Sequence, residues 1–310
     1  TTMKVLITGG AGYVGTGLIL VLLNAGHKVT VFDNLTFGID PILPFFRNPS
    51  FEFIRGDIRD KAEVKEASRE ADIVIHLAAI VGYPACRKDP DLAEAVNVKG
   101  TQNVIDATSK DQLIIFGSTG SNYGAVEEVC TEETPLNPLS LYGQTKTLAE
   151  RMLLEERKTI AWRFATAFGV APRLRLDLLV NDFTHKAVTE GYLVIYEKHF
   201  MRTFIHVHDM ARAFLFGIEN QDQMVDNVFN VGSKKMNYSK EDICNLIKKH
   251  TGVYVHYADV GEDADKRNYV VSYDKINKLG FDTTISVEDG IKELVRVCKA
   301  IEFRRPYANV

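Results

Sequence analysis

The sequence has few cysteines and no long hydrophobic run. Its four cysteines, Cys86, Cys130, Cys244 and Cys298, lie far apart and form no Cys-x-x-Cys pair. Zinc sites and disulfide frameworks depend on closely spaced cysteines, so neither is supported. The longest aliphatic run, 18–23, is much shorter than the roughly 20 residues that span a bilayer. No basic and apolar leader precedes the first predicted strand, so we expect a soluble protein of the reducing cytoplasm that does not attach to membranes.

The sequence also lacks an excess of charge of one sign. It contains 37 Lys and Arg residues and 41 Asp and Glu residues, a formal net charge of −4. Proteins that bind nucleic acid through a groove usually carry a large positive patch, so we expect no nucleic-acid partner. Hydrophobic residues make up 45% and charged residues 25% of the chain, as in ordinary globular proteins. These proportions exclude a disordered or repetitive chain.

Short apolar segments alternate with helical segments through the first half of the sequence. Strands are predicted at 4–8, 28–32, 51–54, 73–77, 112–116 and 159–163, and helices at 12–25, 60–69, 89–108 and 139–156. This alternation is typical of parallel strands joined by crossover helices. We therefore predict a doubly wound α/β fold.

A glycine-rich turn follows the first predicted strand and opens the first predicted helix. In the segment from Gly9 to Gly15, Gly9 permits the tight turn, Gly12 lets the backbone approach a diphosphate and Gly15 allows close helix packing. Asp33 ends the next predicted strand, where a carboxylate accepts hydrogen bonds from a ribose 2′-hydroxyl and repels a 2′-phosphate. A plain turn followed by an exposed Asp33 is the alternative interpretation. The spacing of these features favours a Rossmann sheet that binds NAD in preference to NADP.

Tyr142 and Lys146 lie one turn apart on the helix predicted at 139–156, so they share a face. A cation there, beside an oxidised nicotinamide, lowers the pKa of the phenol and makes Tyr142 a usable base near neutral pH. Many helices carry such a pair on their surface, so its meaning depends on context. The hydroxyl-rich segment 117–124 follows the fifth predicted strand, and ligands bind beyond the carboxyl ends of strands in such sheets. We therefore expect these hydroxyls to face the cofactor.

With these motifs the sequence resembles the extended short-chain dehydrogenase/reductases, in particular the branch of NAD-dependent nucleotide-sugar epimerases and dehydratases. The resemblance covers nearly the whole chain. It implies that Tyr142 is the catalytic acid and base, that Lys146 orients the nicotinamide ribose and tunes Tyr142, and that Thr119 binds the sugar hydroxyl that is oxidised. The implied cofactor contacts are Gly9, Gly12, Tyr13, Val14, Gly15, Asp33, Asn34, Asp57, Ile58, Leu77, Ala78, Ala79, Asn97, Tyr142 and Lys146.

The same resemblance implies a nucleotide-diphosphate sugar as substrate. The planar guanidinium of arginine suits a diphosphate because it can meet two phosphate oxygens at once. Each arginine in the second half of the chain could instead have a structural role. The expected substrate contacts are Thr119, Ser121, Asn122, Thr166, Arg173, Asn181, Arg202 and Arg267.

Beyond residue 169 the alternation of strands and helices becomes irregular. Helices are predicted at 209–219, 240–250 and 287–300, and the apolar run 228–231 is predicted to return to the main sheet. We therefore expect two interleaved units. The NAD-binding Rossmann domain comprises 1–169 plus about 204–235, and the smaller substrate lobe comprises 170–203 and 236–310.

Departures from the family pattern narrow the expected reaction. The dehydratase branch carries Asp-Glu directly after the catalytic threonine, where this chain has Gly120-Ser121, so a 4,6-dehydratase is disfavoured. Thr166 replaces the usual asparagine of the sixth-strand motif, so the substrate contacts differ from those of a typical UDP-galactose epimerase. The segment 173–184 resembles a smaller subgroup that acts on GDP-linked manno-heptoses, in which the same chemistry can stop at the 4-keto sugar.

We predict NAD-dependent chemistry at C4 of a nucleotide sugar, first as a 4-epimerase that passes through a 4-keto intermediate. The alternative is a 4-dehydrogenase of the GDP-heptose type that releases the 4-keto sugar. A 4,6-dehydratase and a non-catalytic NAD sensor are less favoured. The resemblance also implies a homodimer formed through helices near 89–108 and 139–156, although no heptad seam is evident there.

Two features suggest other chemistry. His206 and His208 alternate along a predicted strand, but no third ligand follows at regular spacing, so we predict no metal site. Cys86 lies in the loop after the fourth predicted strand, where it could serve as an acid or base at a sugar ring carbon. A packed loop thiol is the favoured interpretation.

Overall fold

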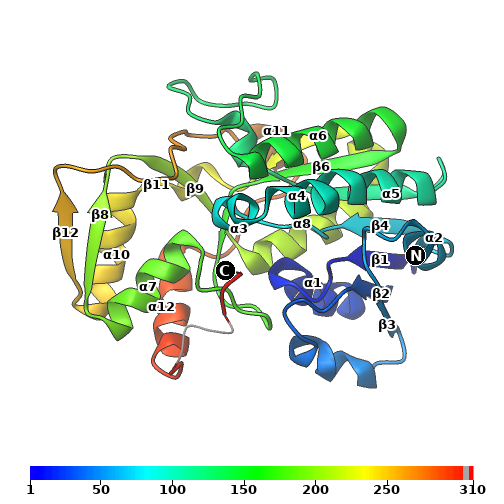
Figure 1. Cartoon of the computed structure of the whole chain (residues 1–310), viewed down its shortest axis with the longest axis horizontal. Helices are drawn as coiled ribbons and strands as arrows, with labels where there is room; N and C mark the ends of the chain where they lie inside the picture. The colour runs from blue at the N-terminus through cyan, green and yellow to red at the C-terminus, as the bar shows by residue number, and fades with distance from the viewer. Residues whose placement is uncertain (303–306, 310) are drawn as a thin grey trace.

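A parallel sheet of seven strands forms the centre of the larger part of the molecule (Figure 1). The computed structural model describes residues 1–302 and 307–309. The strand order is β3-β2-β1-β4-β5-β6-β10, and every neighbouring pair is parallel. The strands are β1 (Lys4–Thr8), β2 (Lys28–Asp33), β3 (Phe51–Arg55), β4 (Ile73–His76), β5 (Leu113–Thr119), β6 (Thr159–Phe164) and β10 (Asn227–Val231). This order confirms the predicted doubly wound fold, including the return of 228–231 to the main sheet.

Helices cover both faces of this sheet because the strands are apolar on both sides. Successive side chains of a strand point to opposite faces, so Ile7 packs on one face and Leu6 on the other. The helices α1 (Tyr13–Asn24) and α8 (Val207–Glu219) cover the Ile7 face. The helices α2 (Lys61–Ser68), α5 (Gly100–Ala107) and α6 (Leu141–Glu156) cover the Leu6 face.

The prediction of one regular helix over 89–108 is wrong. The segment contains α4 (Pro90–Glu94), a π-helical turn (Ala95–Lys99) and α5, and it follows α3 (Tyr83–Lys88). Asp89 starts α4 by accepting a hydrogen bond from the Leu92 amide, at 3.0 Å. In the π-helical turn, the Asn97 side chain accepts from the Ile80 amide at 2.7 Å and donates to Thr145 Oγ1 at 3.1 Å. The turn therefore anchors the loop after β4 to α6.

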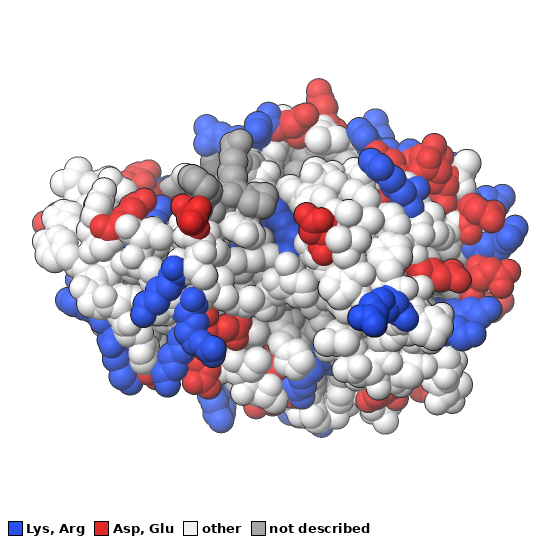
Figure 2. All heavy atoms as spheres, turned by 90° about the horizontal axis from the view of Figure 1, so that it is seen from below, with Lys and Arg blue, Asp and Glu red and all other residues white. Residues whose placement is uncertain are grey.

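Smaller elements complete the sheet domain and its connections. They are 3-10 helices at Asp40–Arg47, Gly120–Tyr123 and Lys234–Met236, together with α9 (Gln221–Met224) and α11 (Asp274–Lys278). None of the helices within 1–302 and 307–309 combines the length and apolar composition needed to cross a membrane. On the face seen from below, basic and acidic side chains are interspersed (Figure 2).

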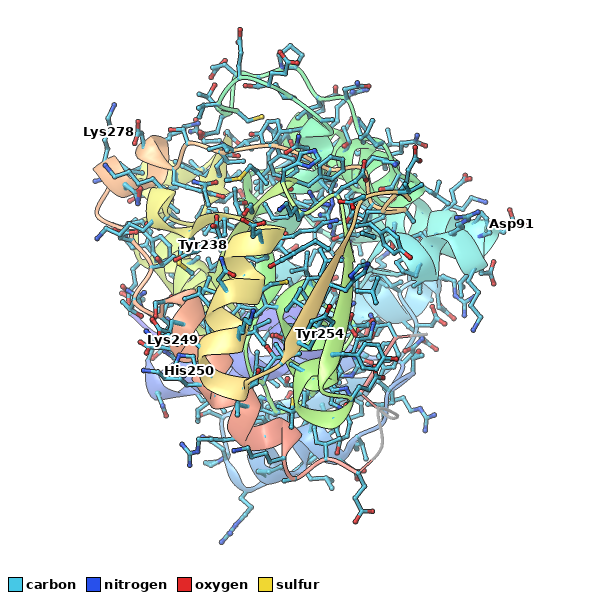
Figure 3. The ribbon with its side chains drawn as sticks, turned by 90° about the vertical axis from the view of Figure 1, so that its left-hand side faces the viewer. Asp91, Tyr238, Lys249, His250, Tyr254 and Lys278 are labelled. Atoms are coloured by element: carbon cyan, nitrogen blue, oxygen red, sulfur yellow. The ribbon has the colours of Figure 1, made fainter. Side chains whose placement is uncertain are left out.

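The second half of the molecule is built from short strands and three longer helices. The strands are β7 (Thr166–Phe168), β8 (Tyr192–Tyr196), β9 (Met201–His206), β11 (Asn237–Ser239) and β12 (Tyr254–Ala258), and the helices are α7 (Leu179–Thr189), α10 (Lys240–Thr251) and α12 (Val287–Cys298). One sheet has the order β11-β9-β7, and β8 pairs with β12 in a second sheet. This second sheet lies against α10, where Ile195 and Ile243 belong to one apolar core, and Tyr254 lies on β12 (Figure 3).

His206 has a structural role at the start of α8. Its Nδ1 accepts a hydrogen bond from the His208 amide at 3.0 Å, and its Nε2 lies 3.2 Å from the Glu293 carboxylate. No group of three His, Cys, Asp or Glu side chains in the described residues is arranged to hold a metal ion. His206 therefore joins α8 to α12.

Candidate active site

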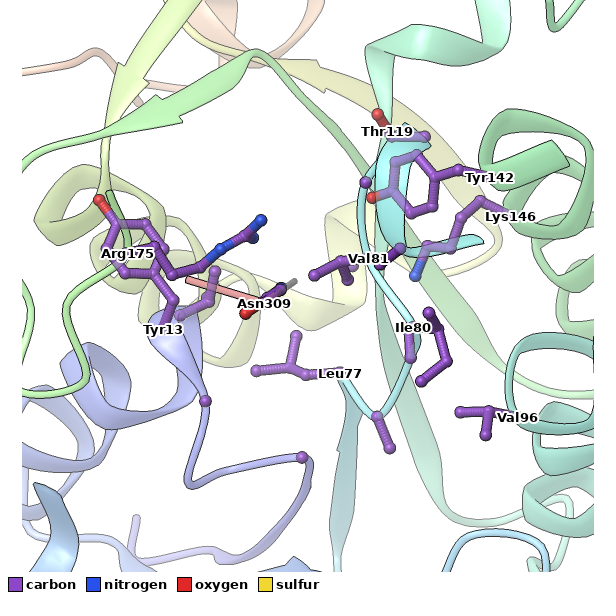
Figure 4. Close-up of a pocket in the computed structure, with 18 of the residues that line it drawn as sticks. Tyr13, Leu77, Ile80, Val81, Val96, Thr119, Tyr142, Lys146, Arg175 and Asn309 are labelled. Carbon is purple, nitrogen blue, oxygen red and sulfur yellow. The ribbon is translucent and has the colours of Figure 1, made fainter. Parts of the chain in front are cut away.

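A cavity of about 670 Å³ lies beyond the carboxyl ends of the central strands (Figure 4). Both its size and its position are typical of ligand sites in doubly wound folds. The predicted residues that line it are Gly9, Gly12, Tyr13, Val14, Gly15, Asp33, Asn34, Asp57, Ile58, Leu77, Ala78, Ala79, Thr119, Ser121, Tyr142, Lys146, Thr166, Arg173 and Arg267. Four predicted residues, Asn97, Asn122, Asn181 and Arg202, are not part of this lining and lie behind it.

The glycine turn presents backbone to the cavity. Gly9 has φ +72°, and a Cβ atom there would lie 2.7 Å from the Ala78 nitrogen. A Cβ atom on Gly15 would lie 2.5 Å from the Gly10 Cα, so Gly15 lets α1 pack against its own turn. Helix α1 begins after Gly12 with no side-chain cap and no acidic residue in its first turn. Its first amides are therefore available to an anion.

Asp33 lines the cavity at the end of β2. One carboxylate oxygen accepts from the Ala11 amide at 3.0 Å and the other from the Leu35 amide at 2.7 Å. Burial raises the pKa of Asp33, while these two backbone hydrogen bonds oppose the rise. The carboxylate thus supports the glycine turn and faces the place expected for a ribose.

Tyr142 and Lys146 project into the cavity from α6, and Thr119 from the end of β5 (Figure 4). Thr119 Oγ1 accepts a hydrogen bond from the Ser121 amide at 3.1 Å, and Tyr142 lies beside Thr119 (Figure 4). Burial raises the pKa of Tyr142 to about 12, and the positive charges of Arg175 and Arg267 lower it. The sequence pattern predicted a lowering by Lys146 beside an oxidised nicotinamide, whereas in the structure the positive charges that lower the pKa of Tyr142 are those of Arg175 and Arg267.

Lys146 is a buried cation with an aromatic neighbour. Its Nζ lies 4.2 Å from the centre of the Phe116 ring, and burial lowers its pKa to about 7. A buried amine of this kind sits beside the place where the resemblance puts the nicotinamide ribose. The anion-binding turn, the Asp33 carboxylate and Lys146 together fit the diphosphate and the two riboses of NAD.

Glu150 lies on α6 one turn after Lys146 and braces the end of β5. It forms a buried ion pair with Arg163 at 2.5 Å and accepts a hydrogen bond from Ser118 Oγ at 2.6 Å. The Asn122 amide group also donates to it, at 3.3 Å. These contacts hold the turn that carries Thr119. Glu150 was missed in the sequence, although its spacing of four residues from Lys146 is a usable signal.

The opposite wall of the cavity carries arginines paired with carboxylates. Arg175 lies 3.0 Å from Asp177, and Arg267 lies 2.6 Å from Asp265. Arg175 faces the centre of the cavity from the side opposite Tyr142 (Figure 4). The sequence reasoning missed Arg175, and its only signal was its position two residues after Arg173.

Two residues expected to touch substrate instead brace this wall. Arg202 is buried and donates to the carbonyl oxygen of Asp265 at 3.1 Å. The Asn181 side chain donates to the carbonyl oxygen of Arg175 at 2.8 Å and accepts from the Gly169 amide at 3.0 Å. Both act on the backbone that carries the cavity arginines.

Thr166 lines the cavity with an unsatisfied hydroxyl. Its Oγ1 is buried and has no hydrogen-bond partner in the part of the chain that the structure describes. Buried hydroxyls usually have a partner, so this atom fits a hydrogen-bonding group of a ligand. Cys86, in contrast, is not part of the lining. Its thiol donates to the Ile80 carbonyl oxygen at 3.2 Å, and burial raises its pKa to about 11.

Comparison with known proteins identifies the family. The pattern of the NAD dependent epimerase/dehydratase family matches residues 5–232. The chain is 27% identical to the CDP-paratose 2-epimerase of Salmonella typhi over 94% of this chain and 98% of that protein. It is 28% identical to the UDP-glucose 4-epimerase of Lactobacillus helveticus over 82% of this chain and 84% of that protein.

Solved structures of similar proteins contain the cofactor. The UDP-glucose 4-epimerase of Thermus thermophilus in complex with NAD is 25% identical, with a TM-score of 0.83 over 96% of this chain and 99% of that chain. The UDP-glucuronic acid 4-epimerase of Bacillus cereus, in complex with UDP-glucuronic acid and NAD, is 26% identical, with a TM-score of 0.84 and the same coverage. The chain therefore belongs to the NAD dependent epimerase/dehydratase family and uses NAD as its cofactor.

Proposed function

We propose that the protein is a nucleotide-sugar 4-epimerase. The observation that carries this proposal is the placement of Tyr142, Lys146 and Thr119 side by side in the same cavity as the NAD cradle, with Arg175 across from them (Figure 4). Relatives named as UDP-glucose and UDP-glucuronic acid 4-epimerases act at the same carbon and support it.

In the proposed mechanism Tyr142 moves the proton of the C4 hydroxyl. Thr119 holds that hydroxyl while the Tyr142 oxygen takes its proton, and the C4–O bond becomes a carbonyl. NAD, when bound, supplies the reversible oxidant for C4. The 4-keto sugar then rotates in the cavity and presents its other face. Tyr142 returns the proton to the C4 oxygen, which yields the other stereoisomer. The charges of Arg175 and Arg267 favour the phenolate that the first step needs.

The second half of the molecule would bind the nucleotide diphosphate. We assign cofactor binding to 1–169 plus about 204–235, and substrate binding to 170–203 and 236–310. The guanidinium groups of Arg175 and Arg267 support this division, because both come from the ranges assigned to the substrate and both line the cavity.

A screen of substrates tests the proposal. The purified enzyme is incubated with UDP-, GDP-, CDP- and dTDP-linked sugars, and the products are identified by NMR. An inverted C4 stereocentre is the expected result. A released 4-keto sugar with an equal amount of NADH would make the protein a 4-dehydrogenase, and a lack of turnover on every sugar would contradict both activities.

We also propose a cytoplasmic homodimer formed through α5 and α6. Leu148 on α6 is 41% exposed, which supports a contact surface there, and the four cysteines are all unpaired, which supports a reducing compartment. Light scattering of the purified protein should give twice the monomer mass. A Leu148→Glu variant should shift it toward the monomer, whereas Val194→Glu on β8 should leave the dimer intact.

A further inference from the structure

Arg173 differs from the other arginines of the cavity in lacking a carboxylate partner. Its side chain is buried, with the residue 4% exposed, and it lines the cavity. Arg175 and Arg267 each have an ion pair, but no carboxylate within 1–302 and 307–309 pairs with Arg173. Burial, together with the charge of Arg175, lowers the pKa of Arg173 to about 10. Among the described residues only the more distant charge of Asp177 offsets this burial, and a buried cation without a paired counter-ion is costly, so this position favours an anionic ligand.

Neutral groups from two distant segments hold the Arg173 guanidinium in place. Its Nη1 donates to Asn309 Oδ1 at 2.7 Å, and its carbon centre lies 4.0 Å from the centre of the Phe37 ring. Asn309 is fixed in turn, because its amide donates to Asp177 at 3.1 Å. The end of the described chain thus enters the cavity between Tyr13 and Val81 (Figure 4), between α1 and α7 (Figure 1).

These contacts place Arg173 on the cofactor side of the cavity. Its backbone amide donates to Thr16 Oγ1 at 3.1 Å, and Thr16 belongs to the N-terminal part of α1. Phe37 follows Asp33 on the loop after β2 and also lines the cavity. The guanidinium therefore lies between the start of α1, where a diphosphate binds, and the loop expected at the adenosine ribose.

We propose that Phe37, Arg173 and Asn309 form a clasp over bound NAD, in which Arg173 pairs with the cofactor diphosphate and slows its release. This inference rests on the NAD site of the proposed function and not on the identity of the sugar. The sequence predicted that Arg173 contacts the substrate, and in the clasp Arg173 contacts the cofactor instead. The clasp also gives Asn309 a role in keeping one NAD molecule through both halves of an epimerisation.

The release of NADH from the loaded protein tests the clasp directly. NADH fluorescence is followed after rapid mixing with excess unlabelled NAD, with no sugar present. Arg173→Gln should speed release about 10- to 100-fold, because a charge-assisted contact to phosphate is lost. Asn309→Ala should give a smaller increase, and the double variant should release NADH no faster than Arg173→Gln alone, because Asn309 acts through Arg173.

Control variants separate the clasp from general damage. Arg69→Gln removes an exposed arginine that pairs with Glu66 and should release NADH at the wild-type rate. Thermal unfolding of each cofactor-free variant reports whether it folds. Arg173→Lys, which keeps the charge but loses the planar contacts, should fall between the wild type and Arg173→Gln.

Unchanged NADH release in folded Arg173→Gln and Asn309→Ala variants would overturn the clasp. A raised KM for the sugar nucleotide, with NADH release unchanged, would also overturn it and return Arg173 to the substrate. Faster NADH release from variants of a protein that turns over no sugar would support the clasp while contradicting the proposed epimerase activity.

Discussion

The two walls of the cavity are built by different means. On the sheet side, the glycine turn and the ends of adjacent parallel strands present backbone amides and short side chains in fixed positions. On the opposite side, Arg175 and Arg267 come from separate segments and are held by Asp177 and Asp265. The first wall depends on the main-chain geometry of one rigid sheet, and the second depends on side-chain ion pairs. Substrate preference can therefore change by substitutions on the second wall without disturbing the cofactor cradle.

The contrast between the two walls would be wrong if catalysis did not depend on the sheet-side wall. Replacing Tyr142→Phe removes the proton carrier but keeps the ring in place, so turnover should fall by about 100- to 10,000-fold. NADH binding measured by fluorescence should remain. Tyr192→Phe, at an exposed tyrosine of β8 that is 55% exposed, serves as the control and should keep full turnover. Retention of more than a tenth of wild-type turnover by Tyr142→Phe would exclude the proposed proton transfer.

Behind the sheet-side wall lies the buried ion pair of Glu150 and Arg163, on which we expect stability to depend. Glu150→Gln leaves the buried Arg163 without its counter-charge, so the free energy of unfolding should fall by about 3–5 kcal/mol. Urea denaturation measures this change. Glu66→Gln breaks an exposed pair and should change stability by less than about 1 kcal/mol. Equal effects of the two substitutions would mean that the Glu150 pair is not structural.

Lys146 makes the stability of the cofactor-free protein depend on pH. Its folded pKa of about 7 lies below the ordinary lysine value, so between these values the unfolded chain binds a proton that the folded protein does not. The free energy of unfolding should therefore rise with pH above 7. Below pH 7 Lys146 is protonated in both the folded and the unfolded state, so the full cost of burying its charge applies. Between pH 7.5 and 9 the wild type should gain about 2 kcal/mol more than Lys146→Met in urea unfolding. Parallel pH profiles of the two proteins would contradict the lowered pKa.

The smallest expected effect is a change in cofactor preference on replacing Asp33, which lies on the sheet-side wall. Asp33→Asn removes the charge that repels a 2′-phosphate but keeps an oxygen that can accept from the Ala11 or Leu35 amide. The preference for NAD over NADP should fall about tenfold, equal to about 1.4 kcal/mol, in binding titrations. Asp111→Asn, on a surface turn away from the cavity, is the control. An unchanged preference for NAD over NADP would show that Asp33 does not discriminate between a ribose 2′-hydroxyl and a 2′-phosphate.

The sheet-side wall could be predicted largely from sequence because its signals are local. The glycine turn, Asp33 and the pair of Tyr142 and Lys146 each lie within a short segment, and their shared edge follows from parallel strands. The exception is the segment after Asp89, where a π-helical turn interrupts a pattern that reads as one helix. Periodicity does not reveal one extra residue in a turn.

The opposite wall and the clasp were harder to predict because their contacts join distant parts of the chain. Arg173 meets Asn309 across a separation of 136 residues, and Arg202 bonds the backbone of Asp265. Whether an arginine faces a ligand or braces a loop depends on which carboxylate or carbonyl lies nearby in space. Sequence shows that Arg202 and Asn181 are present but not that they brace the wall from behind.

The position of β10 has a consequence for synthesis of the protein. Strand β6 lies inside the finished sheet only because β10 pairs with it, and the segments that form β7, β8, β9 and α7 are made between the two. At roughly 5–20 residues per second a ribosome needs several seconds to add that stretch. During this time the nascent chain carries an apolar strand with one open edge, which is the surface most prone to mispair with another chain. Early binding of β6 by a chaperone, or fast closure by β10, would then decide how much of the new protein escapes aggregation.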